Sequence, residues 1–98
     1  MNTTEKIEQW AIARQLHNAD SSKQALKLME EVGELAQGIV KNNDALVKDS
    51  IGDIYVVLTI LSMQLGYDVE HCIDLAYNEI KDRRGSMVNG VFVKESDL

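Results

Sequence analysis

The sequence has little cysteine and no long hydrophobic run. Cys72 is the only cysteine among the 98 residues, so no disulfide forms within one chain, and a reducing cytoplasm is the simplest expectation. The most apolar segment, 54–65, has twelve residues and is too short to cross a bilayer. The first residues, MNTTEKIEQW, lack the basic start and apolar run of a signal peptide. We therefore expect a soluble, cytoplasmic protein.

Positive charge is also scarce. Ten Lys and Arg residues stand against 16 Asp and Glu residues, which gives a formal net charge of −6 at pH 7. This balance argues against a nucleic-acid groove and against a polybasic membrane patch. A small anionic ligand bridged to the protein by a metal ion stays open. The length is that of one domain with a limited core, so we interpret residues 1–98 as a single domain.

Proline is absent, and apolar residues recur with helical spacing along most of the chain. After Asp20, they follow the i, i+3, i+4, i+7 rule through four turns. The apolar segment 54–65 continues a helical pattern and exceeds the usual length of a strand. Asn89-Gly90, between two short apolar runs, is the strongest short hairpin signal. The sequence therefore predicts an all-α domain with helices at about 3–17, 22–41, 44–65 and 69–84 and a small hairpin at about 87–94.

The second half of the predicted helix 44–65 is apolar on nearly every side. A helix of this kind needs partners all round it, and so short a chain offers few of them. We therefore expect the protein to form an oligomer through its helices.

Carboxylates gather on one side of the predicted helix 22–41. At about 100° per residue, Glu31 and Glu34 lie about 60° apart on neighbouring turns, and Glu30 lies about 40° from Glu34. Asp49 and Asp53, at i and i+4, repeat this design on the next helix. If the two helices pack antiparallel, these carboxylates converge on one pocket. Such a pocket suits Mg²⁺, or alternatively Mn²⁺, because these hard cations take oxygen ligands and leave positions for water and phosphate.

The alternative interpretation of these acids is an ordinary solvated helix face. The absence of a nearby cysteine or ExxH motif argues against zinc and against a carboxylate-bridged di-iron site. Gly33 and Gly52 lie beside the acids inside the predicted helices, where glycine costs roughly 1 kcal/mol relative to alanine. They indicate either close helix packing or room for a ligand.

Three segments, 30-EEVGE-34, 51-IGDIYVVL-58 and 78-NEIKDRRGSMVNGVFVK-94, resemble the MazG-like nucleotide pyrophosphohydrolases of bacteria and their phages. The resemblance covers roughly residues 24–94. It implies a four-helix protomer that assembles into a homodimer or homotetramer. It also implies a Mg²⁺-dependent enzyme that hydrolyses nucleoside triphosphates to the monophosphate and pyrophosphate, in house-cleaning of the nucleotide pool.

The family pattern is EExxE followed by ExxD, and its carboxylates hold Mg²⁺. By this resemblance Glu31, Glu34 and Asp53 are metal ligands. Ser50 stands where the second motif has glutamate, and Asp49, one residue earlier, is the nearest substitute. The departure leaves two alternatives to an active enzyme: a catalytically weak or silent nucleotide-binding, regulatory oligomer, and a plain helical oligomerisation domain.

If the resemblance holds, hydrolysis needs a water directed at a phosphorus while pyrophosphate leaves. An acidic pocket binds an anionic triphosphate only through bridging cations, which also lower the pKa of bound water. A carboxylate that is not a ligand can orient this water as a general base. Glu30 and Glu34 are both candidates for that role.

The resemblance also indicates residues that contact the substrate. Asn78 and Lys81, at i and i+3 in the last predicted helix, would hold phosphates. Arg84 either continues this row or complements the helix dipole. Lys27 is either a salt-bridge partner of the acids or a phosphate contact. Trp10, the only tryptophan, is either a platform for a base or a core residue.

Overall fold

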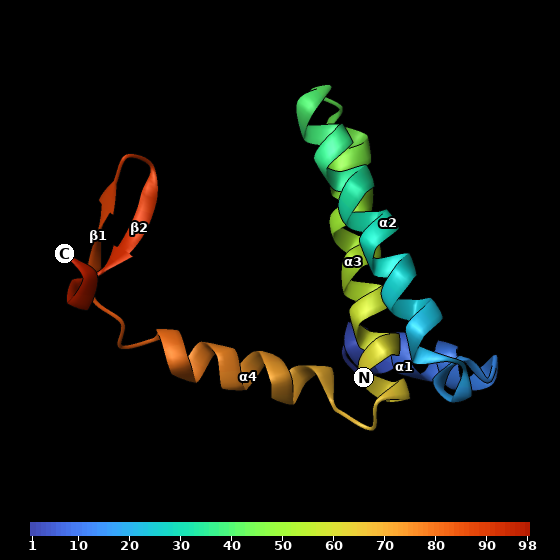
Figure 1. The fold of residues 1–98 in the computed structure, drawn as a ribbon. Helices are drawn as coiled ribbons and strands as arrows, with labels where there is room; N and C mark the ends of the chain where they lie inside the picture. Colours follow the sequence, from blue (N-terminus) through green and yellow to red (C-terminus); the bar gives the residue numbers. More distant parts are fainter.

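The computed structural model describes all residues 1–98 as four α-helices, two short 3₁₀ turns and a C-terminal hairpin (Figure 1). The prediction of a mostly helical chain that ends in a hairpin is confirmed. In chain order the elements are α1 (Thr3–Ala13), η1 (Leu16–Asn18), α2 (Ser21–Val40), α3 (Asp44–Gln64), α4 (Val69–Ile80), β1 (Gly85–Val88), β2 (Val91–Lys94) and η2 (Glu95–Asp97).

Each α-helix begins at a side chain that accepts a hydrogen bond from a free backbone N–H of the first turn. Asn2 and Glu5 form a capping box on α1: the Asn2 side chain accepts from the Glu5 amide at 2.8 Å, and the Glu5 carboxylate accepts from the Asn2 amide at 3.1 Å. The side chains at the starts of the other helices are Asp20, Asn43 and Asp68. The polar residues of these short connections therefore fix where the helices start.

Helix α1 is shorter than the predicted segment 3–17. It ends at Ala13, and Gln15 then adopts a left-handed conformation with φ 61° before η1 begins. The Gln64 side chain holds η1 against α3, because its Nε2 donates to the Leu16 carbonyl oxygen at 2.9 Å. This turn brings Leu16 back toward the end of α3.

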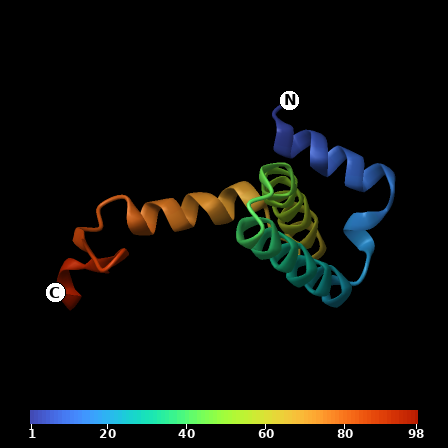
Figure 2. The same cartoon turned by 90° about the horizontal axis from the view of Figure 1, so that it is seen from above.

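Helices α2 and α3 pack antiparallel along most of their lengths, and α3 lies between α1 and α2 (Figure 2). At the α2–α3 connection Gly38 is buried, and a Cβ there would lie 3.1 Å from the Val47 Cγ2 atom, so the helices approach closely. By contrast, Gly33 and Gly52 have no atom within 4 Å of a Cβ position. Close packing within the chain therefore explains Gly38 but not Gly33 or Gly52.

The small core lies where α1 crosses α3. Ala11 is fully buried, and Val57 and Ile60 of α3 are nearly so. The Thr4 and Tyr55 hydroxyls share a hydrogen bond of 2.5 Å between these two helices. We call residues 3–64, which comprise α1, η1, α2 and α3, the three-helix unit.

Helix α4 and the hairpin extend away from the three-helix unit (Figures 1 and 2). We call residues 69–94 the arm. Helix α4 packs against the end of α3, and its Glu70 carboxylate accepts a hydrogen bond from the Asn2 side chain at 2.9 Å. After the buried Val69 and the half-buried Glu70, the residues of α4 are exposed. The prediction of a four-helix bundle within the protomer is therefore wrong for α4, because the chain turns outward at Gly66–Asp68 instead of folding back.

The end of the arm also differs from the predicted helix 69–84. Helix α4 stops at Ile80, and strand β1 already starts at Gly85, where the Glu95 amide donates to the Arg84 carbonyl oxygen at 2.8 Å. The hairpin turns at Asn89 and Gly90, both with positive φ, as the sequence predicts. None of the helices is long and apolar enough to span a membrane.

Candidate active site

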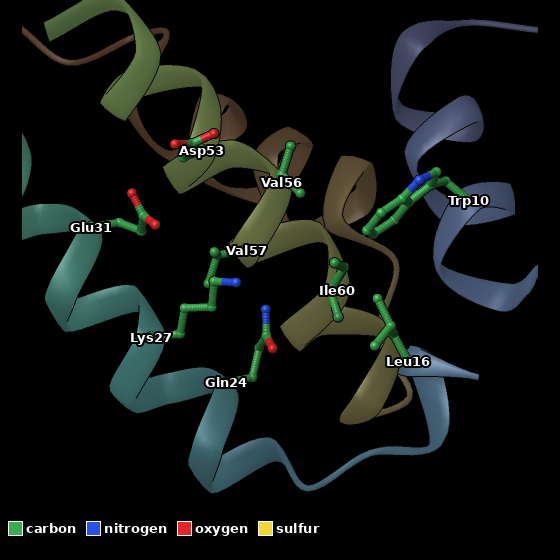
Figure 3. A pocket seen from close by; sticks show the side chains of 9 residues that line it. All are labelled: Trp10, Leu16, Gln24, Lys27, Glu31, Asp53, Val56, Val57 and Ile60. Atoms are coloured by element: carbon green, nitrogen blue, oxygen red, sulfur yellow. The ribbon is translucent and has the colours of Figure 1, made fainter. Parts of the chain in front are cut away.

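The antiparallel packing of α2 and α3 brings acids of both helices to one cavity of about 250 Å³ (Figure 3). Glu31 enters from α2 and Asp53 from α3. Lys27 lies one turn before Glu31 on the same face of α2. We call this space the α2–α3 cavity; its lining comprises Trp10, Leu16, Gln24, Lys27, Glu31, Asp53, Val56, Val57 and Ile60.

The carboxylates at the end of the cavity that holds Glu31 and Asp53 repel one another. Removal from water raises the pKa of the Glu31 carboxyl, and the neighbouring Glu34 and Asp53 raise it further. Burial likewise raises the pKa of Asp53, with added contributions from Asp49 and Glu34. Lys27 opposes both shifts, yet it forms no ion pair with either acid. The salt-bridge role for Lys27 is therefore not what the structure shows.

One carboxylate oxygen of this group is left without a partner. The Oε2 atom of Glu31 is buried and makes no hydrogen bond. A buried charged oxygen is costly unless a cation or a donor satisfies it. A cation or a hydrogen-bond donor at the point where α2 faces Asp53 would satisfy this oxygen.

The donor set fits Mg²⁺ in chemistry, although the carboxylates do not form a closed cage. No three acidic, histidine or cysteine side chains converge closely enough to hold a metal by themselves. Mg²⁺ usually takes one or two carboxylates, and water and substrate phosphates complete its coordination. Glu31 and Asp53, on facing helices, match that requirement.

Ser50, the departure from the second motif, is fully buried on α3, and its hydroxyl Oγ has no hydrogen-bond partner. A neutral hydroxyl supplies no charge to the site. Asp49 is exposed and acts on Asp53 through its charge. The chain therefore lacks the carboxylate that a glutamate at position 50 would supply, and the exposed Asp49 is its nearest substitute.

The two candidates for the general base differ in position. Glu34 is exposed, but its charge raises the pKa of both Glu31 and Asp53, so it lies near both. Glu30 is exposed, is not part of the cavity lining and contributes to neither shift. Geometry therefore favours Glu34 over Glu30.

The three basic and polar residues expected to hold phosphates lie on the arm, away from the cavity (Figure 1). Asn78 is exposed in α4, and Lys81 is the residue at which α4 ends. Arg84 is not in the helix at all, because the chain has already left it to enter β1. A single chain does not bring this row together with Glu31 and Asp53.

Trp10 lies at the opposite end of the cavity from the acids (Figure 3). Its side chain is 47% exposed, so it is not a core residue, and the Arg14 guanidinium lies 4.3 Å from the centre of its ring. Gln24 and Leu16 also line this end, and sequence reasoning missed both. For Gln24 a signal existed, because it stands three residues before Lys27 on the same face of the helix.

Comparison with known proteins bears on these features. A family model described as the MazG nucleotide pyrophosphohydrolase domain matches residues 20–87, which include α2, α3 and α4. The chain is 52% identical over 59 residues to a protein of Haemophilus phage HP1, described as an uncharacterized 18.2 kDa protein in the rep-hol intergenic region. This match covers 59% of the chain but 36% of the phage protein, so the chain spans little more than a third of that relative. No solved structure gives a significant match.

Proposed function

We propose, since the chain belongs to the family of MazG nucleotide pyrophosphohydrolase domains, that it hydrolyses nucleoside triphosphates to the monophosphate and pyrophosphate with the help of Mg²⁺. One observation carries this proposal: Glu31 and Asp53 face one another across the α2–α3 cavity, and a Glu31 oxygen there is buried without a partner. An acidic site of this kind attracts an anionic substrate only together with divalent cations. House-cleaning of the nucleotide pool is the role that this activity would serve.

Glu31 and Asp53 would hold the metal, and the neighbouring Glu34 and Asp49 would add negative charge to the site. The bound cation supplies charge neutralisation for the phosphates and a lower pKa for a coordinated water. Mn²⁺ is an alternative, because it accepts the same oxygen donors. Because the substrate is itself anionic, its binding beside these carboxylates would depend on the cation.

A carboxylate near the metal ligands can accept the proton of the attacking water while pyrophosphate departs. Glu34 is our first candidate, because its charge acts on both Glu31 and Asp53. Glu30 is the second, since it belongs to the same motif but stands outside the cavity lining. A Glu34→Gln variant that retains metal binding but loses turnover would support the first assignment.

The substrate contacts divide between the three-helix unit and the arm. Lys27 lines the cavity beside the acids and would contact a phosphate. Asn78, Lys81 and Arg84 would contact the leaving pyrophosphate, but only from the arm of a second copy, because the arm of the same chain points away. Trp10 would offer a face to the base at the other end of the cavity.

A homodimer or homotetramer is therefore part of the proposal. Only eight of the 98 residues are buried in a single chain, too few for a stable core of this length. Ile73 and Ile80 of α4 are about half exposed, and so is Ile51 of α3. Burial of these side chains against another copy would stabilise the fold and would bring an arm next to a cavity.

The experiment that tests the function is pyrophosphate release from a panel of canonical and modified deoxynucleoside and ribonucleoside triphosphates, with Mg²⁺, with Mn²⁺ and with EDTA. We expect metal-dependent release of pyrophosphate and the matching monophosphate from one or more substrates. Release of orthophosphate instead would place the cut at another bond, and no product from any nucleotide would contradict the proposal.

A catalytically silent nucleotide-binding module is the second candidate, favoured by one observation. Ser50 removes a carboxylate from the second motif and leaves a buried, unpartnered hydroxyl in its place. Nucleotide and metal binding without product after long incubation would favour this module. A change in neither melting temperature nor nucleotide affinity on adding Mg²⁺ would leave a plain oligomerisation domain instead.

A further inference from the structure

Helices α2 and α3 each place a row of side chains along the α2–α3 cavity. Gln24, Lys27 and Glu31 stand at i, i+3 and i+7 on one face of α2, and Asp53 and Ile60 stand at i and i+7 on α3. Because the helices are antiparallel, Glu31 faces Asp53 at one end, and Gln24 lies near Ile60 at the other (Figure 3). Seven residues of helix separate the two ends by about 10 Å.

The two ends differ in chemistry. One carries the carboxylates, whereas the other is closed by Trp10, Leu16 and Ile60. The volume of about 250 Å³ lies below the roughly 300–1,000 Å³ of pockets that enclose a whole ligand. The cavity thus suits the flat, uncharged part of a molecule whose charged part continues past the acids. A nucleoside with its phosphates at Glu31 and Asp53 has this shape.

Gln24 is the polar side chain that α2 places at the apolar end. It is half buried, and its carboxamide points toward the cavity (Figure 3). The carboxamide makes no hydrogen bond within the chain. Gln24 therefore offers an unused donor and an unused acceptor to the cavity that Trp10 also lines.

We propose that Gln24 hydrogen-bonds to the edge of the nucleobase that stacks on Trp10, and that it is a base-binding residue of the site. The inference rests on the proposed function in one respect: that function is the reason to expect phosphates on the bound nucleoside. A carboxamide presents its donor and its acceptor side by side, and rotation by half a turn exchanges them. Each Watson–Crick edge carries an adjacent donor and acceptor, so Gln24 accepts several bases and discriminates weakly among them.

Trp10 and its turn lie outside the region matched to the family, and Gln24 lies near the edge of that region. The acid end of the cavity therefore belongs to the matched residues 20–87, whereas part of the base end is built by α1 and η1. The base is thus bound by residues partly distinct from those that would carry the hydrolysis.

The test uses deoxynucleosides without phosphates, in metal-free buffer, so that neither the metal nor hydrolysis enters the measurement. Trp10 is the only tryptophan, and quenching of its fluorescence reports occupation of the base end. We expect each of the four deoxynucleosides to quench the wild type. Gln24→Leu should weaken their binding by about tenfold, within the effect of losing one bidentate base contact. The matched control is Gln37→Leu, a substitution of an exposed glutamine on the same helix outside the cavity, with unchanged binding.

A second variant, Gln24→Glu, replaces the donor and acceptor pair by acceptors alone. It should favour deoxyguanosine, whose Watson–Crick edge carries two adjacent N–H donors, over thymidine, and the preference should exceed that of the wild type by about tenfold. Circular dichroism checks that each variant folds. Wild-type affinities in both Gln24 variants, or no quenching by any deoxynucleoside, would overturn the inference. Pyrophosphate release that persists alongside such a result would leave the proposed function standing, whereas quenching without any pyrophosphate release would remove only the proposed function.

Discussion

The three-helix unit and the arm follow the same local rules but reach different degrees of burial. Helices in both begin at capping side chains and carry apolar residues at helical spacing. In the three-helix unit, Ala11, Val57 and Ile60 are buried around one another, and the α2–α3 cavity forms beside them. In the arm only Val69 is buried. Local sequence therefore determines the helices, whereas the apolar side of the arm is left exposed by the rest of the chain.

The proposed metal ligands lie in the three-helix unit, so we expect the largest effect from a substitution at Asp53. We expect Asp53→Asn to reduce pyrophosphate release by more than about 100-fold, the upper end of what loss of even an outer-shell partner costs a metal site. The measurement is initial rate at saturating Mg²⁺. Asp97→Asn, an equivalent change beyond the arm, is the control and should stay within about twofold of wild type. Equal rates for Asp53→Asn and wild type would remove Asp53 from the site.

The second prediction concerns which copy supplies the arm. We expect chains with Asp53→Asn and chains with Lys81→Ala each to be poorly active alone and to recover activity when refolded together. In a two-fold dimer about half of the mixed molecules are heterodimers, each with one intact site, so recovery should reach about a quarter of wild type. Two copies of one variant, refolded together, give the baseline. An absence of recovery in mixtures that demonstrably form heterodimers would show that each cavity uses its own arm.

The third prediction concerns the expected contact between the arm and a second copy of the chain, which a charged residue should disrupt. Ile73 is 48% exposed in a single chain, so Ile73→Glu should cost an isolated chain little. If the arm packs on a partner, the buried charge should instead dissociate the assembly. Light scattering should then fall from at least 22.0 kDa, twice the chain mass of 11.0 kDa, to the mass of one chain. A wild type that is already monomeric at micromolar concentration would contradict the expectation.

The smallest effect concerns pH in the metal-free protein. Burial and neighbouring acids raise the folded-state pKa of Glu31 and Asp53, so the folded chain binds more protons than the unfolded chain between their ordinary and raised pKa values. These two groups should therefore lower the free energy of unfolding as pH rises through that range. Urea unfolding in EDTA from pH 4 to 7 should show this fall, and Asp53→Asn should reduce it. An identical pH dependence of the free energy of unfolding in wild type and Asp53→Asn would argue against repulsion between Asp53 and its neighbouring acids.

Much of the three-helix unit follows from its sequence, because caps and helical spacing are local. The apolar spacing predicts α2 and α3 closely. Of the carboxylates expected to converge on one pocket, only Glu31 and Asp53 line the cavity, and no three of them gather closely enough to hold a metal. The left-handed Gln15, which ends α1 early, carries no comparable sequence signal. Leu16 joins the cavity only because Gln64 ties a distant turn to α3, a contact that depends on tertiary structure.

The arm is harder to predict from the sequence, because its structure depends on contacts between distant residues. The helical pattern continues to Arg84 in the sequence, but α4 ends at Ile80 and the chain pairs as a hairpin from Gly85 onward, which lies opposite Lys94. The direction of α4 follows from contacts of its first turn, where Val69 is buried and the Glu70 carboxylate accepts a hydrogen bond from the Asn2 side chain at 2.9 Å. These contacts join residues far apart in the sequence, so a local pattern does not reveal them. A sequence pattern that specifies an apolar face does not specify which surface covers it.

The most direct test of the central claim, that facing acids of α2 and α3 form a divalent metal site, is Mn²⁺ binding followed by electron paramagnetic resonance with a nucleotide that resists hydrolysis. The wild type should bind Mn²⁺, and the nucleotide should tighten this binding because phosphate oxygens complete the coordination. Asp53→Asn should lose most of the affinity, whereas Asp97→Asn should not. Equal Mn²⁺ affinity in wild type and Asp53→Asn, with or without nucleotide, would contradict the account.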